Sequence, residues 1–219
     1  NAVNLLIGAG NSKIAEGEIL RALTPRGEAL VHGKVVTRPV PPEIDDWPHN
    51  LYDAGNTGVS KDLKAGSPRH LQWRGNPRFS RSHDGNSSFL AMVSAGGRIF
   101  YMLDEGSTAF LSLPSKWNLV ARDGFNGKVL WRKALPQTLL MQIGNIKNSF
   151  ANLGHRMVAQ EDLVFATLGY NEPVRAMDSR TGDDVWQNRQ TANTEELILY
   201  DSVLYCAINT SDSNSVKHA

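Results

Sequence analysis

The chain has 219 residues, 23 basic and 22 acidic side chains, a formal net charge of +1 and 41% hydrophobic residues. This composition is typical of a folded globular protein, and it excludes a disordered tail and a strongly basic nucleic-acid-binding domain. The single cysteine, Cys206, excludes an internal disulfide and a multi-cysteine metal site, and no apolar run is long enough to cross a membrane.

The first 36 residues are predicted to form an α/β segment. A short apolar strand up to Ile7 is followed by a helix with Ala15, Ile19 and Leu23 on one face, and Glu28–Val31 resumes as a strand. Pro25 and Gly27 are typical of a turn that ends such a helix. Because one helix and two strands cannot cover both faces of a sheet, we expect the rest of a larger α/β domain to lie upstream.

A proline-rich linker and a long irregular stretch follow. Four prolines within residues 34–48 disfavour regular structure, so residues 37–48 are interpreted as a linker. The stretch from Asp45 to Asp84 is polar and lacks apolar periodicity, and such stretches are usually functional or pack over a neighbouring element. Its basic and aromatic residues favour either a phosphate or nucleic-acid surface, or arginines that bind loop carbonyls and hold the loop in place. The near-neutral charge favours the second interpretation and no nucleic-acid partner.

From residue 88 onward the chain is predicted to be β and repetitive. Three apolar hairpins follow one another, and they align Val93 with Val158 and Ile198, and Phe100 with Phe165 and Tyr205. Glycines Gly96 and Gly97 form the turn of the first hairpin, which is a strong hairpin signal.

A second motif, Ala-x-Asp-x3-Gly-x3-Trp, occurs twice with every anchor 55 residues apart. Its anchors, which we interpret as structural, are Asp123, Gly127 and Trp131 in one copy and Asp178, Gly182 and Trp186 in the other. Glycine supplies a positive φ in the turn, and the aspartate can accept hydrogen bonds from the turn backbone. Each repeat unit therefore has four strands, and insertions fall in Leu103–Trp117 and Gln137–Leu153. The predicted fold class is mainly β: a partial β-propeller of about two and a half four-stranded blades with a short N-terminal α/β segment.

These motifs resemble the pyrroloquinoline-quinone-type repeat of quinoprotein-like β-propellers. The stretch from Asp45 to Gly106 is similar to a bacterial group in which such a propeller follows a methyltransferase-like domain. Residues 18–31 resemble the late helix–turn–strand of class I S-adenosylmethionine-dependent methyltransferases. The resemblance implies a methyltransferase-like tail over residues 1–36, the linker 37–48, and incomplete propeller blades over 49–219. It also implies that Trp131 and Trp186 dock against neighbouring blades, and that the location is extracytoplasmic or periplasmic.

The predicted function is a binding or scaffold module of a multidomain bacterial protein, with no complete active site and no catalytic or metal-binding residue assigned. Its partners are the remaining blades and the upstream α/β domain of the same protein. The alternatives are part of an oxidoreductase that uses pyrroloquinoline quinone with calcium, or a fusion whose chemistry is an upstream methyltransferase that binds S-adenosylmethionine. Asp104 and Glu105 carry oxygen atoms suited to calcium, but an exposed acidic loop is the default interpretation. The candidate ligand-facing residues are His49, Arg69, Trp73, Arg78, Arg81, His83, Asp84, Asp104 and Glu105.

Overall fold

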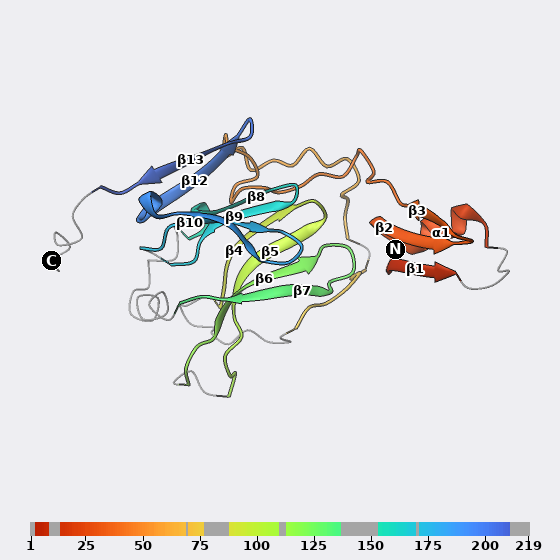
Figure 1. The fold of residues 1–219 in the computed structure, drawn as a ribbon, viewed down its shortest axis with the longest axis horizontal. Helices are drawn as coiled ribbons and strands as arrows, with labels where there is room; N and C mark the ends of the chain where they lie inside the picture. The colour runs from red at the N-terminus through yellow and green to blue at the C-terminus, as the bar shows by residue number, and fades with distance from the viewer. Residues whose placement is uncertain are drawn as a thin grey trace.

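The computed structural model describes residues 3–8, 14–68, 70–76, 88–109, 113–136, 153–169 and 171–210. This part of the chain is mainly β, with a single α-helix. The α/β segment lies at one end of the molecule, a two-stranded hairpin lies at the other, and two four-stranded sheets lie between them (Figure 1). No helix among the described residues is long and apolar enough to span a bilayer.

The N-terminal α/β segment is a three-stranded sheet covered on one face. It comprises β1 (Val3–Gly8), α1 (Glu16–Ala22), β2 (Leu23–Val31) and β3 (Lys34–Thr37). Strand β2 pairs parallel to β1 and antiparallel to β3. Ile19 of the helix packs with Leu23, Ala29 and Val31, which are all buried.

The turn predicted at Pro25 and Gly27 is wrong, because both residues belong to β2. Arg26 donates its backbone N–H to the carbonyl of Arg38, and the N–H of Arg38 donates to Gly27, each at 2.9 Å. This pairing with the chain that leaves β3 keeps β2 extended past the proline. Arg26 itself has φ +63°, a left-handed conformation that is unusual for a residue with a side chain.

No described residue covers the second face of the small sheet, in agreement with the expectation that one helix covers only one face. Four of its apolar side chains, Leu5, Ile7, Leu30 and Val35, are exposed. Three or more neighbouring exposed apolar side chains are typical of a surface that contacts another element.

The predicted repeats are confirmed as antiparallel sheets. The first has the order β4 (Phe89–Ala95), β5 (Arg98–Asp104), β6 (Trp117–Asp123) and β7 (Val129–Ala134). The second consists of β8 (Met157–Gln160), β9 (Leu163–Thr167), β10 (Val174–Asp178) and β11 (Asp184–Asn188), and the short 3-10 helices η1 (Gly154–Arg156) and η2 (Arg189–Thr191) flank it. The third is the hairpin of β12 (Thr194–Tyr200) and β13 (Val203–Ile208).

Successive sheets pack face to face, with their first strands side by side. Strands β4 and β8 are in contact, as are β8 and β12. Val93 pairs with Phe100, Val158 with Phe165 and Ile198 with Tyr205, so the three hairpins share one register. Sheets of four strands whose first strands are adjacent are the blades of a β-propeller. The described residues therefore form a partial propeller of two blades and half of a third.

The core lies between the blades. Phe100, Met102 and Leu119 of the first blade pack with Met157 and Val164 of the second. On its far side the second blade packs Val158, Phe165 and Val174 against Leu197 and Leu199 of β12. Each blade thus buries apolar side chains against its neighbour.

The outer face of the third hairpin has no neighbour among the described residues, and we predict that it makes the isolated chain self-associate. Tyr205 is 55% exposed there, whereas the equivalent Phe100 is 0% exposed, and Tyr200 and Val203 on the same face are also exposed. Light scattering of the 219-residue chain should show mass that rises with concentration. Replacing Val203 and Tyr205 with lysine should suppress this rise, whereas a concentration-independent monomer before substitution would contradict the prediction.

Candidate functional site

The two Asp–Gly turns are built as predicted. The Oδ1 atom of Asp123 accepts the backbone N–H groups of Phe125 and Asn126, both at 2.9 Å. In the second copy, Oδ1 of Asp178 accepts those of Arg180 and Thr181. The glycines of the two turns have φ +74° and +78°. Both aspartates therefore stabilise turn backbone, which is a structural role.

Trp131 joins the first blade to the second. Its indole N–H donates to the carbonyl of Ser179 at 3.0 Å, and the side chain is only 9% exposed. A Cβ on Gly182 would lie 2.7 Å from the indole ring, so this glycine allows the ring to lie against the turn. The predicted docking of Trp131 on the neighbouring blade is confirmed.

Trp73 makes the same contact with the first blade, although it lies outside the repeats. Its indole N–H donates to the carbonyl of Gly124 at 3.0 Å, and a Cβ on Gly127 would lie 2.5 Å from its ring. Gly124 and Gly127 occupy the positions that Ser179 and Gly182 occupy one repeat later. Residues 70–76, which we call the strap, thus take the place that a preceding blade would fill.

Buried Arg122 holds the strap. Its guanidinium donates to the carbonyl of Asn76 at 2.8 Å and to that of Gly127 at 2.7 Å, and its Nε donates to the hydroxyl of Tyr101. We expected arginines within the loop itself to bind loop carbonyls, but the arginine that does so here, Arg122, belongs to β6. Of the arginines predicted for that role, Arg69, Arg78 and Arg81 lie outside the described residues, as do His83 and Asp84.

Trp186 is placed differently from Trp131. It is 40% exposed and lies against Phe165 with ring centroids 6.0 Å apart. No Asp–Gly turn covers its outer side within the part of the chain that the structure describes. The docking predicted for Trp186 therefore stays a prediction.

Residues 43–63 form a second non-repeating element, which we call the axial loop. Its ends are joined, because Leu63 donates its N–H to the carbonyl of Glu43 at 2.8 Å. Inside the loop, the carboxylate of Asp45 accepts the Tyr52 hydroxyl at 2.5 Å and the Lys61 N–H at 2.9 Å. Burial alone would raise the pKa of Asp45, but these hydrogen bonds outweigh it and lower the pKa below its usual range.

The axial loop lies along the inner edge of all three blades. Ser94 of β4 donates its N–H to the carbonyl of Trp47 at 2.8 Å, and Ala159 of β8 donates to that of Pro48 at 3.0 Å. Leu199 of β12 donates to the ring Nε2 of His49 at 3.0 Å. The three donors follow the aligned residues Val93, Val158 and Ile198. Equivalent N–H groups of three successive blades thus bind the three consecutive loop residues 47–49. The loop therefore lies across the first strand of each blade at the same position.

His49 was predicted to face a ligand, but its side chain is 7% exposed and its Nε2 accepts a backbone hydrogen bond. Burial lowers its pKa, and the nearby Asp53 carboxylate opposes this shift without cancelling it. The imidazole is therefore neutral in the fold, and it acts as an acceptor.

We expect this histidine to make the fold weaker below neutral pH. In the unfolded chain His49 has its ordinary pKa of 6.5, whereas in the folded chain its pKa is lower. Between these two pKa values the unfolded chain therefore binds a proton that the folded chain does not bind. The free energy of unfolding should be highest above pH 6.5, fall as the pH decreases through that value, and level off below the folded pKa. Urea unfolding of the wild-type chain and of His49→Gln, whose amide oxygen can still accept the Leu199 N–H, isolates the contribution of His49. A difference between the two proteins that does not change with pH would contradict the assignment.

Asp104 and Glu105 are internal ligands of the first blade. Oδ1 of Asp104 accepts the N–H groups of Gly106 and Lys116 at 2.9 and 2.7 Å, and Asp104 is buried. Glu105 accepts from Arg132 at 3.0 Å and from Asn118 at 2.9 Å. The expected exposed acidic loop is therefore wrong. These carboxylates do not fit a calcium site as they stand, because N–H donors occupy the oxygens that the ion would need. No group of three or more potential metal ligands forms among the described residues.

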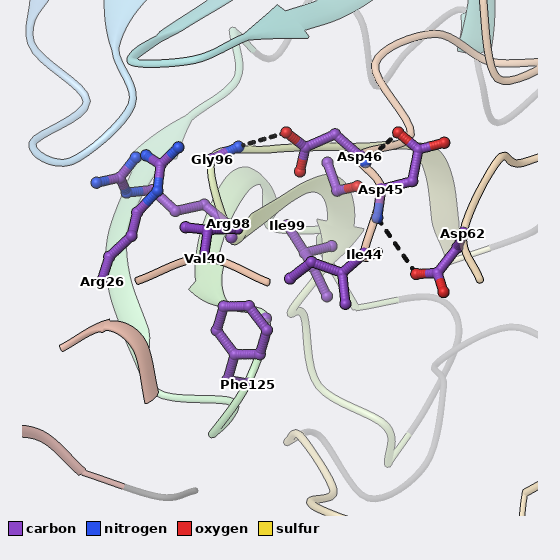
Figure 2. Close-up of a pocket in the computed structure, with 13 residues that line it drawn as sticks. Arg26, Val40, Ile44, Asp45, Asp46, Asp62, Gly96, Arg98, Ile99 and Phe125 are labelled. Carbon is purple, nitrogen blue, oxygen red and sulfur yellow. Dashed lines mark hydrogen bonds between the residues drawn. The ribbon is translucent and has the colours of Figure 1, made fainter. Parts of the chain in front are cut away.

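A cavity of about 270 Å³ lies at the seam between the α/β segment and the first blade (Figure 2). Its lining includes Arg26 of β2, Arg98 of β5, Phe125 of the Asp–Gly turn, and Asp46 of the axial loop. None of these four residues is among the candidate ligand-facing residues predicted from the sequence. Phe125 could have been noticed as an aromatic side chain inside a tight turn, but the approach of β2 to β5 has no local sequence signal.

No protein-family model matches the chain, and no curated protein matches its sequence. Its structure is similar to that of the quinohemoprotein alcohol dehydrogenase from Comamonas testosteroni, with 14% sequence identity and a TM-score of 0.42. The match covers 85% of this chain and 24% of the dehydrogenase chain, so the chain spans about a quarter of that protein's length.

Proposed function

We propose that this chain is a binding or scaffold sector of a β-propeller within a larger multidomain protein. The observation that supports this most directly is the axial loop, which binds equivalent backbone N–H groups on three successive inner strands. The strap and the Asp–Gly turns are likewise used for internal packing. The polar groups of the repeats, the axial loop and the strap are thus used in internal hydrogen bonds of the propeller. We therefore expect ligands or partners to bind at the outer surfaces of the propeller and at the seams between its parts.

The proposed division of the chain is a methyltransferase-like tail over residues 1–36, a linker over 37–48 and propeller blades over 49–219. The bare apolar face of the small sheet supports a larger α/β domain, because Leu5, Ile7, Leu30 and Val35 need a covering layer. In the same way, the exposed face of Tyr200 and Tyr205 supports a further blade as partner. An upstream methyltransferase and its S-adenosylmethionine belong to this proposal and are tested by ligand binding to the full-length protein.

Dye-linked alcohol oxidation by the full-length protein tests the proposed role against the oxidoreductase alternative. The protein is incubated with pyrroloquinoline quinone and calcium, dialysed, and assayed for turnover and for the absorbance of bound quinone. We expect neither. Turnover with bound quinone would contradict the scaffold proposal and favour a site on blades outside this chain.

A further inference from the structure

The cavity at the seam brings together charged side chains from β2, the axial loop and the first blade. Two guanidinium groups reach the same glycine: a Cβ on Gly96 would lie 3.0 Å from Nη1 of Arg26 and 3.1 Å from Nη1 of Arg98. Like charges this close repel each other, and an anion between them would remove that cost. Figure 2 shows both arginines at one side of the cavity.

The two arginines differ in their partners. Arg98 binds Oδ1 of Asp162 at 3.2 Å and the hydroxyl of Ser179 at 3.1 Å. The guanidinium of Arg26 makes no hydrogen bond or ion pair with any residue that the structure describes, and its backbone is held at φ +63°. Arg26 therefore has donors available for a ligand, and Arg98 is fixed beside it.

The opposite side of the cavity is acidic. Asp46 binds the N–H of Gly96 at 3.0 Å through one carboxylate oxygen, and Asp45 and Asp62 lie next to it. Backbone N–H groups of Ala65 and Lys64 bind Asp62, and they lower its pKa although burial opposes this. The lowered pKa values of Asp62 and Asp45 keep both carboxylates ionised at neutral pH.

Between the charged sides the lining is apolar. In Figure 2, Ile99 and Ile44 lie between the arginines and the aspartates, and Phe125 lies below them. Val40 also lines the cavity. Small-ligand sites typically combine such an apolar surface with a few polar groups, and they enclose roughly 300–1,000 Å³. The volume of about 270 Å³ is slightly below that range, which suits a molecule of amino-acid size.

The geometry points to a binding site for a zwitterion of the α-amino-acid type with an apolar or aromatic side chain. Its carboxylate would bind Arg26 and Arg98, its ammonium would face Asp46, and its side chain would contact Phe125. This inference specifies the ligand of the proposed binding module and rests on that function. Because the site combines β2, the axial loop and the first blade, bound ligand would hold the α/β segment against the propeller.

Isothermal titration calorimetry of the full-length protein with L-phenylalanine tests the site. Two matched probes separate the charges: 3-phenylpropanoate lacks the ammonium and 2-phenylethylamine lacks the carboxylate. We expect L-phenylalanine to bind and both probes to bind at least tenfold more weakly, since each loses a charge-assisted interaction. Equal binding of 3-phenylpropanoate would overturn the zwitterion and leave an anion site, and no binding of L-phenylalanine up to about 10 mM would overturn the inference.

Two variants place any binding in this cavity. Arg26→Gln should weaken the affinity for L-phenylalanine at least tenfold. Arg180→Gln removes an exposed arginine of the adjoining turn, and it should change this affinity less than twofold. Equal effects of the two variants would refute the assignment. The quinone turnover assay depends on neither arginine, so failure of this inference is distinguishable from failure of the scaffold proposal.

Discussion

Replacing Trp131 with alanine should lower the free energy of unfolding by about 3–5 kcal/mol. The indole is almost fully buried between the first two blades and donates a hydrogen bond to Ser179. Its removal leaves a cavity against Gly182 and an unpaired carbonyl, and the fold cannot fill that space without moving a turn. Urea unfolding at low protein concentration, followed by tryptophan fluorescence and circular dichroism, measures the loss.

Trp186→Ala is the matched control, because Trp186 occupies the same position one repeat later and is 40% exposed. We expect it to cost no more than about 1 kcal/mol in this chain. Equal losses for the two substitutions would show that burial between blades is not what makes Trp131 important. A Trp186 loss that grows to about 3 kcal/mol in the full-length protein would support a following blade that covers it.

Replacing Arg122 with methionine should destabilise the fold by at least about 3 kcal/mol, because a hydrogen bond to a charged group contributes about 1.5–3 kcal/mol and several are lost together. The methionine keeps the apolar stem but leaves the Tyr101 hydroxyl and the carbonyls of Asn76 and Gly127 without their donor. The strap should then detach from β6. Limited proteolysis between residues 61 and 76, with urea unfolding in parallel, measures both effects.

Arg132→Met serves as the control for Arg122. Arg132 also binds through its guanidinium, to Glu105 at 3.0 Å, but its side chain is 45% exposed. We expect a loss below about 1 kcal/mol and no new cleavage in the strap. If Arg122→Met leaves the strap as resistant to protease as the wild type does, then the contacts of Trp73 and Gln72 with the turn suffice to anchor it, and the role assigned to Arg122 is wrong.

The repeats could be predicted because their signals are local. Asp123, Gly127 and their counterparts specify a turn through residues four positions apart, and the aligned Val93 and Phe100 specify a hairpin register. The bare face of the small sheet could also be predicted, since it follows from counting elements. These features need no knowledge of which distant segments meet.

The non-repeating contacts could not be predicted in the same way. Trp73 lies 54 residues before Gly127, close to the 51 residues between Trp131 and Gly182, but no strand pattern surrounds it. The burial of Asp104 and the role of Arg122 depend on segments that approach from elsewhere in the chain. The cavity beside Arg26 depends on the left-handed backbone of Arg26 within β2. From the sequence, Pro25 and Gly27 predicted a turn at this position instead of a strand.

The axial loop contacts all three inner strands, and residue-resolved hydrogen exchange tests this placement directly. Ser94, Ala159 and Leu199 lie on the inner edge of their sheets, so their amides are protected only if the loop binds them. We predict that all three exchange slowly, and that His49→Ala makes the Leu199 amide exchange rapidly while Ser94 and Ala159 stay protected. Rapid exchange at all three positions in the wild-type protein would show that the loop does not lie on the inner strands, and would contradict the account.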